Sequence, residues 1–187
     1  MSADAVGVLV VSATRAEAAH VPPGTDLLIT GIGKVRAASA LARRLALGDY
    51  HRVVNIGTSG ALRDGYRGLF TPSRVVEHDI SAAQLAALGF HQPDEWDVPG
   101  GDGTVLATGD MFVTEPEHRE RLARRAELVD MEGAAIVQVC ADFAVPVRLV
   151  KVVSDDADDT AFDWPSVIDA AARDLGEWLD GTGFGSR

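Results

Sequence analysis

Short apolar runs alternate with segments of helical periodicity along this chain. Runs such as Val6–Val11 and Arg52–Ile56 are apolar at consecutive positions, which is typical of strands covered by helices on both faces of a sheet. Strands or extended segments are predicted at Val6–Val11, Asp26–Thr30, Arg52–Ile56, Ser73–Ile80, Thr104–Ala107, Leu128–Met131 and Pro146–Val153. Helices are predicted at Lys34–Leu47, Ala82–Leu88, Glu115–Glu127, Glu132–Phe143 and Trp164–Leu179, with a loop at His91–Gly103. This alternation predicts an α/β fold, a three-layer αβα sandwich around a mixed, mostly parallel sheet.

The chain is expected to form one domain over residues 1–187, because it contains no repeat, low-complexity segment or linker. The Gly-rich segment 181–187 is predicted to be a frayed tail. Ligands of such folds bind beyond the carboxyl ends of the strands. Four polar or Gly-rich segments are predicted to lie there: Ser12–Glu17, Gly31–Gly33, Gly57–Gly60 and Ser154–Asp159.

Composition narrows the class of protein. Among 187 residues, 47% are apolar, as expected of a folded chain, and the formal net charge of −11 argues against nucleic acid or an anionic membrane as partner. Cys140 is the single cysteine, which excludes an intramolecular disulfide framework and favours core packing. No apolar run approaches the ~20 residues of a membrane helix, and the start lacks a basic signal region. We therefore expect a cytoplasmic protein.

Taken singly, the Gly-rich motifs are weak evidence for any particular function. The segment Gly31–Lys34 has neither dinucleotide-binding nor Walker spacing, and Gly57–Gly60 lacks the spacing of a hydrolase nucleophile elbow. Both are predicted to be structural turns. The five histidines show no metal-ligand spacing, so no metal and no cofactor are expected.

Three carboxylates allow both a structural and a chemical interpretation. Glu132 lies where a strand enters a helix, a position that favours any negative charge. In the structural interpretation, Glu17 is an ordinary polar residue on a short helix. The acidic run that contains Asp155 does not match a calcium loop, because Ala157 occupies the third position. Asp155 directly follows a buried strand, so we expect it to be the least exposed carboxylate of that run.

Together the segments resemble the nucleoside phosphorylase/nucleosidase family, most closely the 5′-methylthioadenosine/S-adenosylhomocysteine nucleosidases. The matching segments are Gly31–Val35, Val53–Leu62, His78–Asp79, Thr108–Val113, Val129–Ala135 and Val152–Asp158. The resemblance spans nearly the whole chain and implies a phosphorylase/hydrolase-like fold. It implies hydrolysis of a purine nucleoside, as part of purine or methionine salvage.

The resemblance also implies roles for individual residues. Asp155 is similar to the acid that protonates the purine, Glu17 to the base that activates water, and Glu132 to the glutamate that binds the ribose hydroxyls. The substrate-binding residues implied are Ile32, Thr58, Phe112, Val113, Met131, Ser154 and Phe162. Cleavage through an oxocarbenium-like sugar needs assistance to the leaving base and delivery of water, which accounts for carboxylates with separate tasks.

Alternatives stay open at this point. A purine nucleoside phosphorylase would need arginines for phosphate, and Arg52 lies at the far end of its strand from the Gly57–Gly60 segment. A futalosine hydrolase and a non-catalytic nucleoside-binding protein are the other candidates. A homodimer is expected, with the apolar helix residues Ala134, Ala135, Val139 and Phe143 contributing to it. The alternative for that helix face is packing against the sheet.

Overall fold

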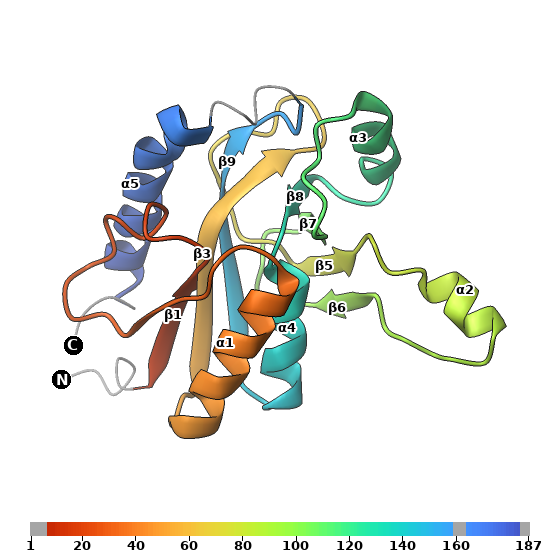
Figure 1. The fold of residues 1–187 in the computed structure, drawn as a ribbon. Coiled ribbons are helices and arrows are strands. Elements are labelled where there is room, and N and C mark those ends of the chain that lie inside the picture. Colours follow the sequence, from red (N-terminus) through yellow and green to blue (C-terminus); the bar gives the residue numbers. More distant parts are fainter. Residues whose placement is uncertain (1–6, 159–163, 184–187) are drawn as a thin grey trace.

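The computed structural model describes residues 7–158 and 164–183, which form one mixed sheet flanked by helices (Figure 1). The strands are β1 (Val8–Ser12), β2 (Leu27–Ile29), β3 (Arg52–Ala61), β4 (Leu69–Phe70), β5 (Arg74–Glu77), β6 (Glu95–Asp97), β7 (Val105–Thr108), β8 (Leu128–Asp130) and β9 (Val147–Asp155). The helices are α1 (Lys34–Leu47), α2 (Ala82–Ala87), α3 (Pro116–Leu122), α4 (Gly133–Asp142) and α5 (Trp164–Thr182). The predicted αβα class is confirmed.

The long strand β3 is the centre of the sheet. The strand order is β2-β1-β3-β8-β7-β5-β6, and β9 pairs with β3 as well. Pairing is parallel for β1–β2, β1–β3, β3–β9, β5–β7 and β7–β8, and antiparallel for β3–β8, β4–β9 and β5–β6. The sheet is thus mostly parallel, as predicted.

Alternate residues of the central strands pack against different helical layers. Leu9 and Val11 contact a core cluster built by α1 and α4, whereas Val8 and Val10 belong to a cluster with α5. Figure 1 shows α1 and α4 on one side of these strands and α5 on the other. Because both faces are covered, the apolar pattern of β1 is continuous rather than alternating. In contrast, α2 buries no residue and projects away from the sheet.

The prediction of a turn at Gly57–Gly60 is wrong, because these residues continue β3 up to Ala61. Parallel pairing with β9 extends over Thr58 and Ser59, and antiparallel pairing with β8 begins at Gly60. The glycines of this segment leave room for neighbouring side chains, and the chain does not reverse there. The predicted loop His91–Gly103 is wrong in part, because β6 lies within it and pairs with β5.

Several boundaries also differ from the predictions. The strand expected at Ser73–Ile80 ends at Glu77, where Glu77 and Asp79 turn to form ion pairs with Lys34. Helix α3 ends at Leu122, before the predicted end at Glu127, whose carboxylate instead accepts a hydrogen bond from the backbone N–H of β7 residue Val105 (2.9 Å). The two-residue strand β4 was too short to be predicted.

Cys140 packs in the α1–α4 core, and burial raises the pKa of its thiol to about 12. The helix face predicted to form a dimer interface is also buried within this chain. Ala134, Ala135 and Val139 lie in core clusters, and only Phe143 is substantially exposed, at 40%. That part of the dimer prediction is wrong, because the sheet and α1 already cover these residues. Across the described ranges, no helix has the length and apolar character needed to cross a membrane.

Candidate functional site

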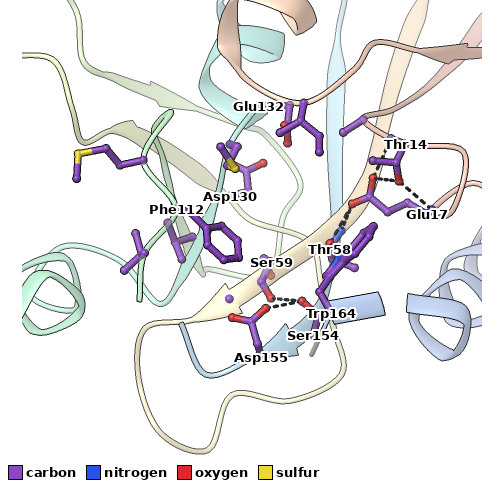
Figure 2. A pocket seen from close by; sticks show the side chains of 17 residues that line it. Thr14, Glu17, Thr58, Ser59, Phe112, Asp130, Glu132, Ser154, Asp155 and Trp164 are labelled. Atoms are coloured by element: carbon purple, nitrogen blue, oxygen red, sulfur yellow. Dashed lines mark hydrogen bonds between the residues drawn. The ribbon is translucent and has the colours of Figure 1, made fainter. Parts of the chain in front are cut away.

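A cavity of about 450 Å³ opens at the carboxyl ends of the parallel strands (Figure 2). Its walls come from the residues that follow β1 and β7, from the ends of β3 and β9, from β8 and the two residues after it, from the loop before α1 and from the start of α5. The lining residues are Ala13, Thr14, Glu17, Ile32, Thr58, Ser59, Gly60, Met111, Phe112, Val113, Val129, Asp130, Met131, Glu132, Ser154, Asp155 and Trp164. The position agrees with the general rule for parallel α/β sheets.

The structure brings nearly all the site residues expected from sequence to this cavity. Those that line it are Glu17, Glu132, Asp155, Ile32, Thr58, Phe112, Val113, Met131 and Ser154. Phe162 lies outside the described residues. Trp164, Ser59 and Asp130 line the cavity too and were not expected there.

Glu17 is a buried carboxylate held by neutral donors on both oxygens. Oε1 accepts hydrogen bonds from the backbone N–H and the hydroxyl of Thr58, both at 2.9 Å. Oε2 accepts from the backbone N–H of Thr14 (3.0 Å) and from its hydroxyl (2.9 Å). Glu17 lies in a turn after β1 and not on the short helix expected from sequence. The turn and β3 together fix the direction of the carboxylate.

Glu132 lies at the N-terminus of α4 and is only 8% exposed. Burial, reinforced by the neighbouring negative charge of Asp130, raises the pKa of Glu132 to about 7, although the Lys151 charge and a hydrogen bond act in the opposite direction. That hydrogen bond comes from the backbone N–H of Gly33 to Oε1 (2.8 Å). Glu132 therefore changes its charge near neutral pH while its orientation is held by the start of α1.

A buried ion pair lies next to Glu132. Lys151, in β9, is 1% exposed, and its Nζ lies 2.8 Å from Oδ2 of Asp130 at the end of β8. Burial alone lowers the pKa of Lys151, but the charges of Asp130 and Glu132 outweigh it and the net shift is upward. Asp130 also accepts hydrogen bonds from the hydroxyl of Thr108 (2.6 Å) and the backbone N–H of Gly133 (2.9 Å). The signal in the sequence is a lysine directly between apolar residues, Val150 and Val152, in a strand.

Asp155 ends β9 on the opposite side of the cavity from Glu132 (Figure 2). Its Oδ2 accepts a hydrogen bond from the hydroxyl of Ser154 (2.7 Å), and its Oδ1 accepts one from the backbone N–H of Ala157 (2.9 Å). The next residue, Asp156, instead forms an ion pair with Arg67. The two adjacent carboxylates thus have different partners, and only Asp155 lines the cavity.

The cavity offers carboxylates and an aromatic surface, and no cluster suited to a metal. Within residues 7–158 and 164–183, no group of three His, Cys, Asp or Glu side chains is arranged to hold a metal ion. Phe112 lies across the cavity from Thr58 and Trp164 (Figure 2). The arrangement can hold a flat ring against Phe112 and present separate carboxylates to other parts of a ligand.

Comparisons with known proteins agree with this architecture. Residues 102–181 match the family model described as the phosphorylase superfamily. The chain is 30% identical over 183 residues to a 5′-methylthioadenosine/S-adenosylhomocysteine nucleosidase of Geobacillus kaustophilus, covering 81% of this chain and 75% of that protein. It is 27% identical over 154 residues to an aminodeoxyfutalosine nucleosidase of Helicobacter pylori, covering 70% of this chain and 66% of that protein.

A solved structure has the same fold. The crystal structure of a Helicobacter pylori MTAN mutant with 5′-methylthioadenosine in the active site superposes with a TM-score of 0.83 at 22% identity. The superposition covers 94% of this chain and 96% of that one. The likeness extends over nearly the whole length of both chains.

The raised pKa of Glu132 predicts a pH-dependent cost in stability. Because the folded-state value is about 7 against an ordinary 4.5, the protonated form is favoured in the folded chain, and that contribution is lost as the pH rises from about 4.5 to about 7. Glu132→Gln lacks this loss and should gain stability relative to the parent over that window, by up to about 3 kcal/mol. Urea unfolding of both proteins at pH 5 and pH 8 measures it, and a difference that does not change with pH would contradict the assignment.

Proposed function

The chain belongs to the nucleoside phosphorylase/nucleosidase family, and from this premise we propose that it hydrolyses the N-glycosidic bond of a purine nucleoside. The observation that carries the proposal is the presence of three carboxylates, Glu17, Glu132 and Asp155, on different walls of one cavity. Each has a different set of hydrogen-bond partners, so each is suited to a different task. The substrate class is that of 5′-methylthioadenosine and S-adenosylhomocysteine, as the names of the relatives suggest.

The proposed reaction needs two proton transfers, one to the leaving base and one from the attacking water. The bond between C1′ and the base nitrogen breaks, and the base receives a proton from Asp155. A water molecule forms the new bond to C1′ and gives its proton to Glu17. Glu132 accepts hydrogen bonds from the ribose hydroxyls and stabilises the positive charge that develops on the sugar. Phe112 stacks against the base, with Val113, Met131 and Ile32 completing the apolar lining.

The Ser154 hydroxyl supports the assignment of Asp155 as the acid. Its single proton can serve either Asp155 Oδ2, at 2.7 Å, or the backbone oxygen of Ser59, at 3.4 Å. When Asp155 carries a proton on Oδ2, its O–H can donate a hydrogen bond to the Ser154 hydroxyl. The Ser154 hydroxyl then donates its own hydrogen bond to the backbone oxygen of Ser59. The protonated acid is thus accommodated without leaving a polar group unpaired.

The cavity lining favours water over phosphate as the nucleophile. No Arg or Lys occurs among the described residues that line it. A phosphate dianion without a cationic partner would be expensive to hold beside three carboxylates. Phosphorolysis is therefore the weaker candidate, whereas futalosine-type nucleosides stay within the proposed class, in line with the Helicobacter pylori relative.

Incubation with a set of nucleosides tests the proposal directly. 5′-Methylthioadenosine, S-adenosylhomocysteine, inosine and futalosine are each supplied with and without phosphate, and the free base is followed by chromatography. We expect base release from at least one adenine nucleoside or futalosine at a rate independent of phosphate. A rate proportional to phosphate would indicate a phosphorylase, and binding without base release would indicate a nucleoside-binding protein.

Replacement of the acid should affect turnover more than binding. Asp155→Asn keeps the size of the side chain but cannot protonate the base, so kcat should fall by about 10²–10⁴-fold with a smaller change in KM. Asp156→Asn is the matched control, because Asp156 pairs with Arg67 and does not line the cavity. A nitrophenyl riboside, whose leaving group needs no proton, should be largely spared. Near-normal turnover of the nucleoside by Asp155→Asn would refute this role.

The homodimer stays a prediction, and a different face is available for it. Ile32, Val35, Met111 and Phe112 are large apolar side chains that are each more than half exposed. The backbone N–H of Lys34 donates to Asp110 (2.8 Å), which brings the start of α1 beside the loop that carries Met111. We expect a second copy to cover this rim of the cavity. Light scattering at micromolar concentration checks it, and a monomeric mass would contradict it.

A further inference from the structure

We propose that Trp164 is a positioning residue for the attack of water: its indole N–H holds the Thr58 hydroxyl in the orientation that supports Glu17. Trp164 begins α5 and lines the cavity beside Thr58 (Figure 2). Its Nε1 donates a hydrogen bond to Thr58 Oγ1 at 3.0 Å, and Thr58 Oγ1 donates to Glu17 Oε1 at 2.9 Å. This inference rests on the proposed function, in which Glu17 receives the proton of water.

The direction of both hydrogen bonds follows from the donors available. An indole N–H can only donate, so Thr58 Oγ1 must accept from Trp164. An ionised Glu17 can only accept, so the Thr58 hydroxyl must give it its proton. A hydroxyl oxygen has two lone pairs, and Trp164 occupies one of them. The second lone pair of Thr58 Oγ1 is then left for a donor in the cavity, such as a water molecule.

The hydrogen bonds that Glu17 already accepts limit how water can reach its carboxylate. A carboxylate has about four lone-pair positions. In Glu17, Oε1 already accepts one backbone N–H and the Thr58 hydroxyl, and Oε2 accepts one backbone N–H, the Thr14 hydroxyl and, at 3.4 Å, the Ser12 hydroxyl. The backbone donors are fixed, so water reaches Glu17 only through a hydroxyl that moves aside or relays the proton. Trp164 acts on the one hydroxyl that donates to Oε1 and thereby sets the geometry at Glu17.

Helix α5 ties Trp164 to the turn that carries Glu17. The Nε2 atom of His20, three residues after Glu17, lies within hydrogen-bond distance of Oδ1 of Asp169 in α5, at 2.8 Å. Farther along α5, Gly176 packs so closely on the same turn that a Cβ there would stand 2.4 Å from the His20 backbone oxygen. Helix α5, which carries Trp164, therefore packs directly against the turn that carries Glu17.

A double-mutant cycle tests whether Trp164 acts through Thr58. Trp164→Phe keeps an aromatic wall and removes the N–H, so kcat should fall by about two- to tenfold, the range for one neutral hydrogen bond, while KM changes little. In a Thr58→Val background the same replacement should cause no further loss, because the acceptor is absent. Trp178→Phe, on the same helix but packed against the core cluster of Val8 and Val10, is the matched control and should leave kcat unchanged in both backgrounds.

Two further variants keep the outcome decisive. If Trp164→Phe does not fold, incorporation of benzothienylalanine at position 164 retains the shape of tryptophan without the N–H, and the same loss in kcat is expected. Glu17→Gln separates the two proposals: normal turnover by this variant would refute Glu17 as the base. If Glu17→Gln is impaired but Trp164→Phe has a normal kcat, the role of Trp164 is overturned and that of Glu17 is kept. The same conclusion follows if Trp164→Phe causes a further, additive loss in the Thr58→Val background.

Discussion

The buried ion pair between Lys151 and Asp130 is the interaction on which the site depends. Taking two charges out of water costs several kcal/mol each, and further hydrogen bonds to Asp130 help to offset that cost. Thr108 and the N-terminus of α4 supply those partners to Asp130. The pair and its hydrogen bonds therefore join β8, β9, β7 and α4 to one another at the wall of the cavity. Loss of either partner would leave an uncompensated charge in the core.

This pair also contributes to the electrostatics of the neighbouring carboxylate of Glu132. Burial is the largest cause of the raised pKa of Glu132; Asp130 raises that pKa further and Lys151 lowers it, and the resulting value is about 7. Glu17 and Asp155 are instead held by neutral donors at the ends of other strands. One fold thus gives three carboxylates distinct surroundings, which acid, base and sugar-binding tasks require.

The sequence predicted the elements that carry a strong local signal. Helix α1 was predicted over Lys34–Leu47, because an amphipathic run between two glycines determines both ends locally. Strand β6 was missed, because its pairing with β5 comes from tertiary contact and not from apolar periodicity. The helix face at Ala134 and Val139 was assigned to a dimer, because an apolar stripe does not reveal which surface covers it.

The candidate site divides in the same way. Glu132 and Asp155 stand immediately beside buried strands, so their location at the strand ends could be inferred from the chain order. Trp164 could not be inferred, because its contact with Thr58 joins residues 106 positions apart and depends on how α5 docks. Lys151 could not be assigned to the site either, since its partner Asp130 is identified by the three-dimensional structure alone.

The glycines of β3 show why fold and chemistry share one strand. A Cβ at Gly57 would stand 3.1 Å from Glu17 Oε1, and a Cβ at Gly60 would stand 2.9 Å from Asp155 Oδ1. Both contacts are tighter than ordinary van der Waals packing, so a side chain at either position would displace a carboxylate. Thr58 lies between these glycines and donates two hydrogen bonds to Glu17. The central strand thus leaves space for the two carboxylates assigned to proton transfer and fixes one of them, so no turn is needed there.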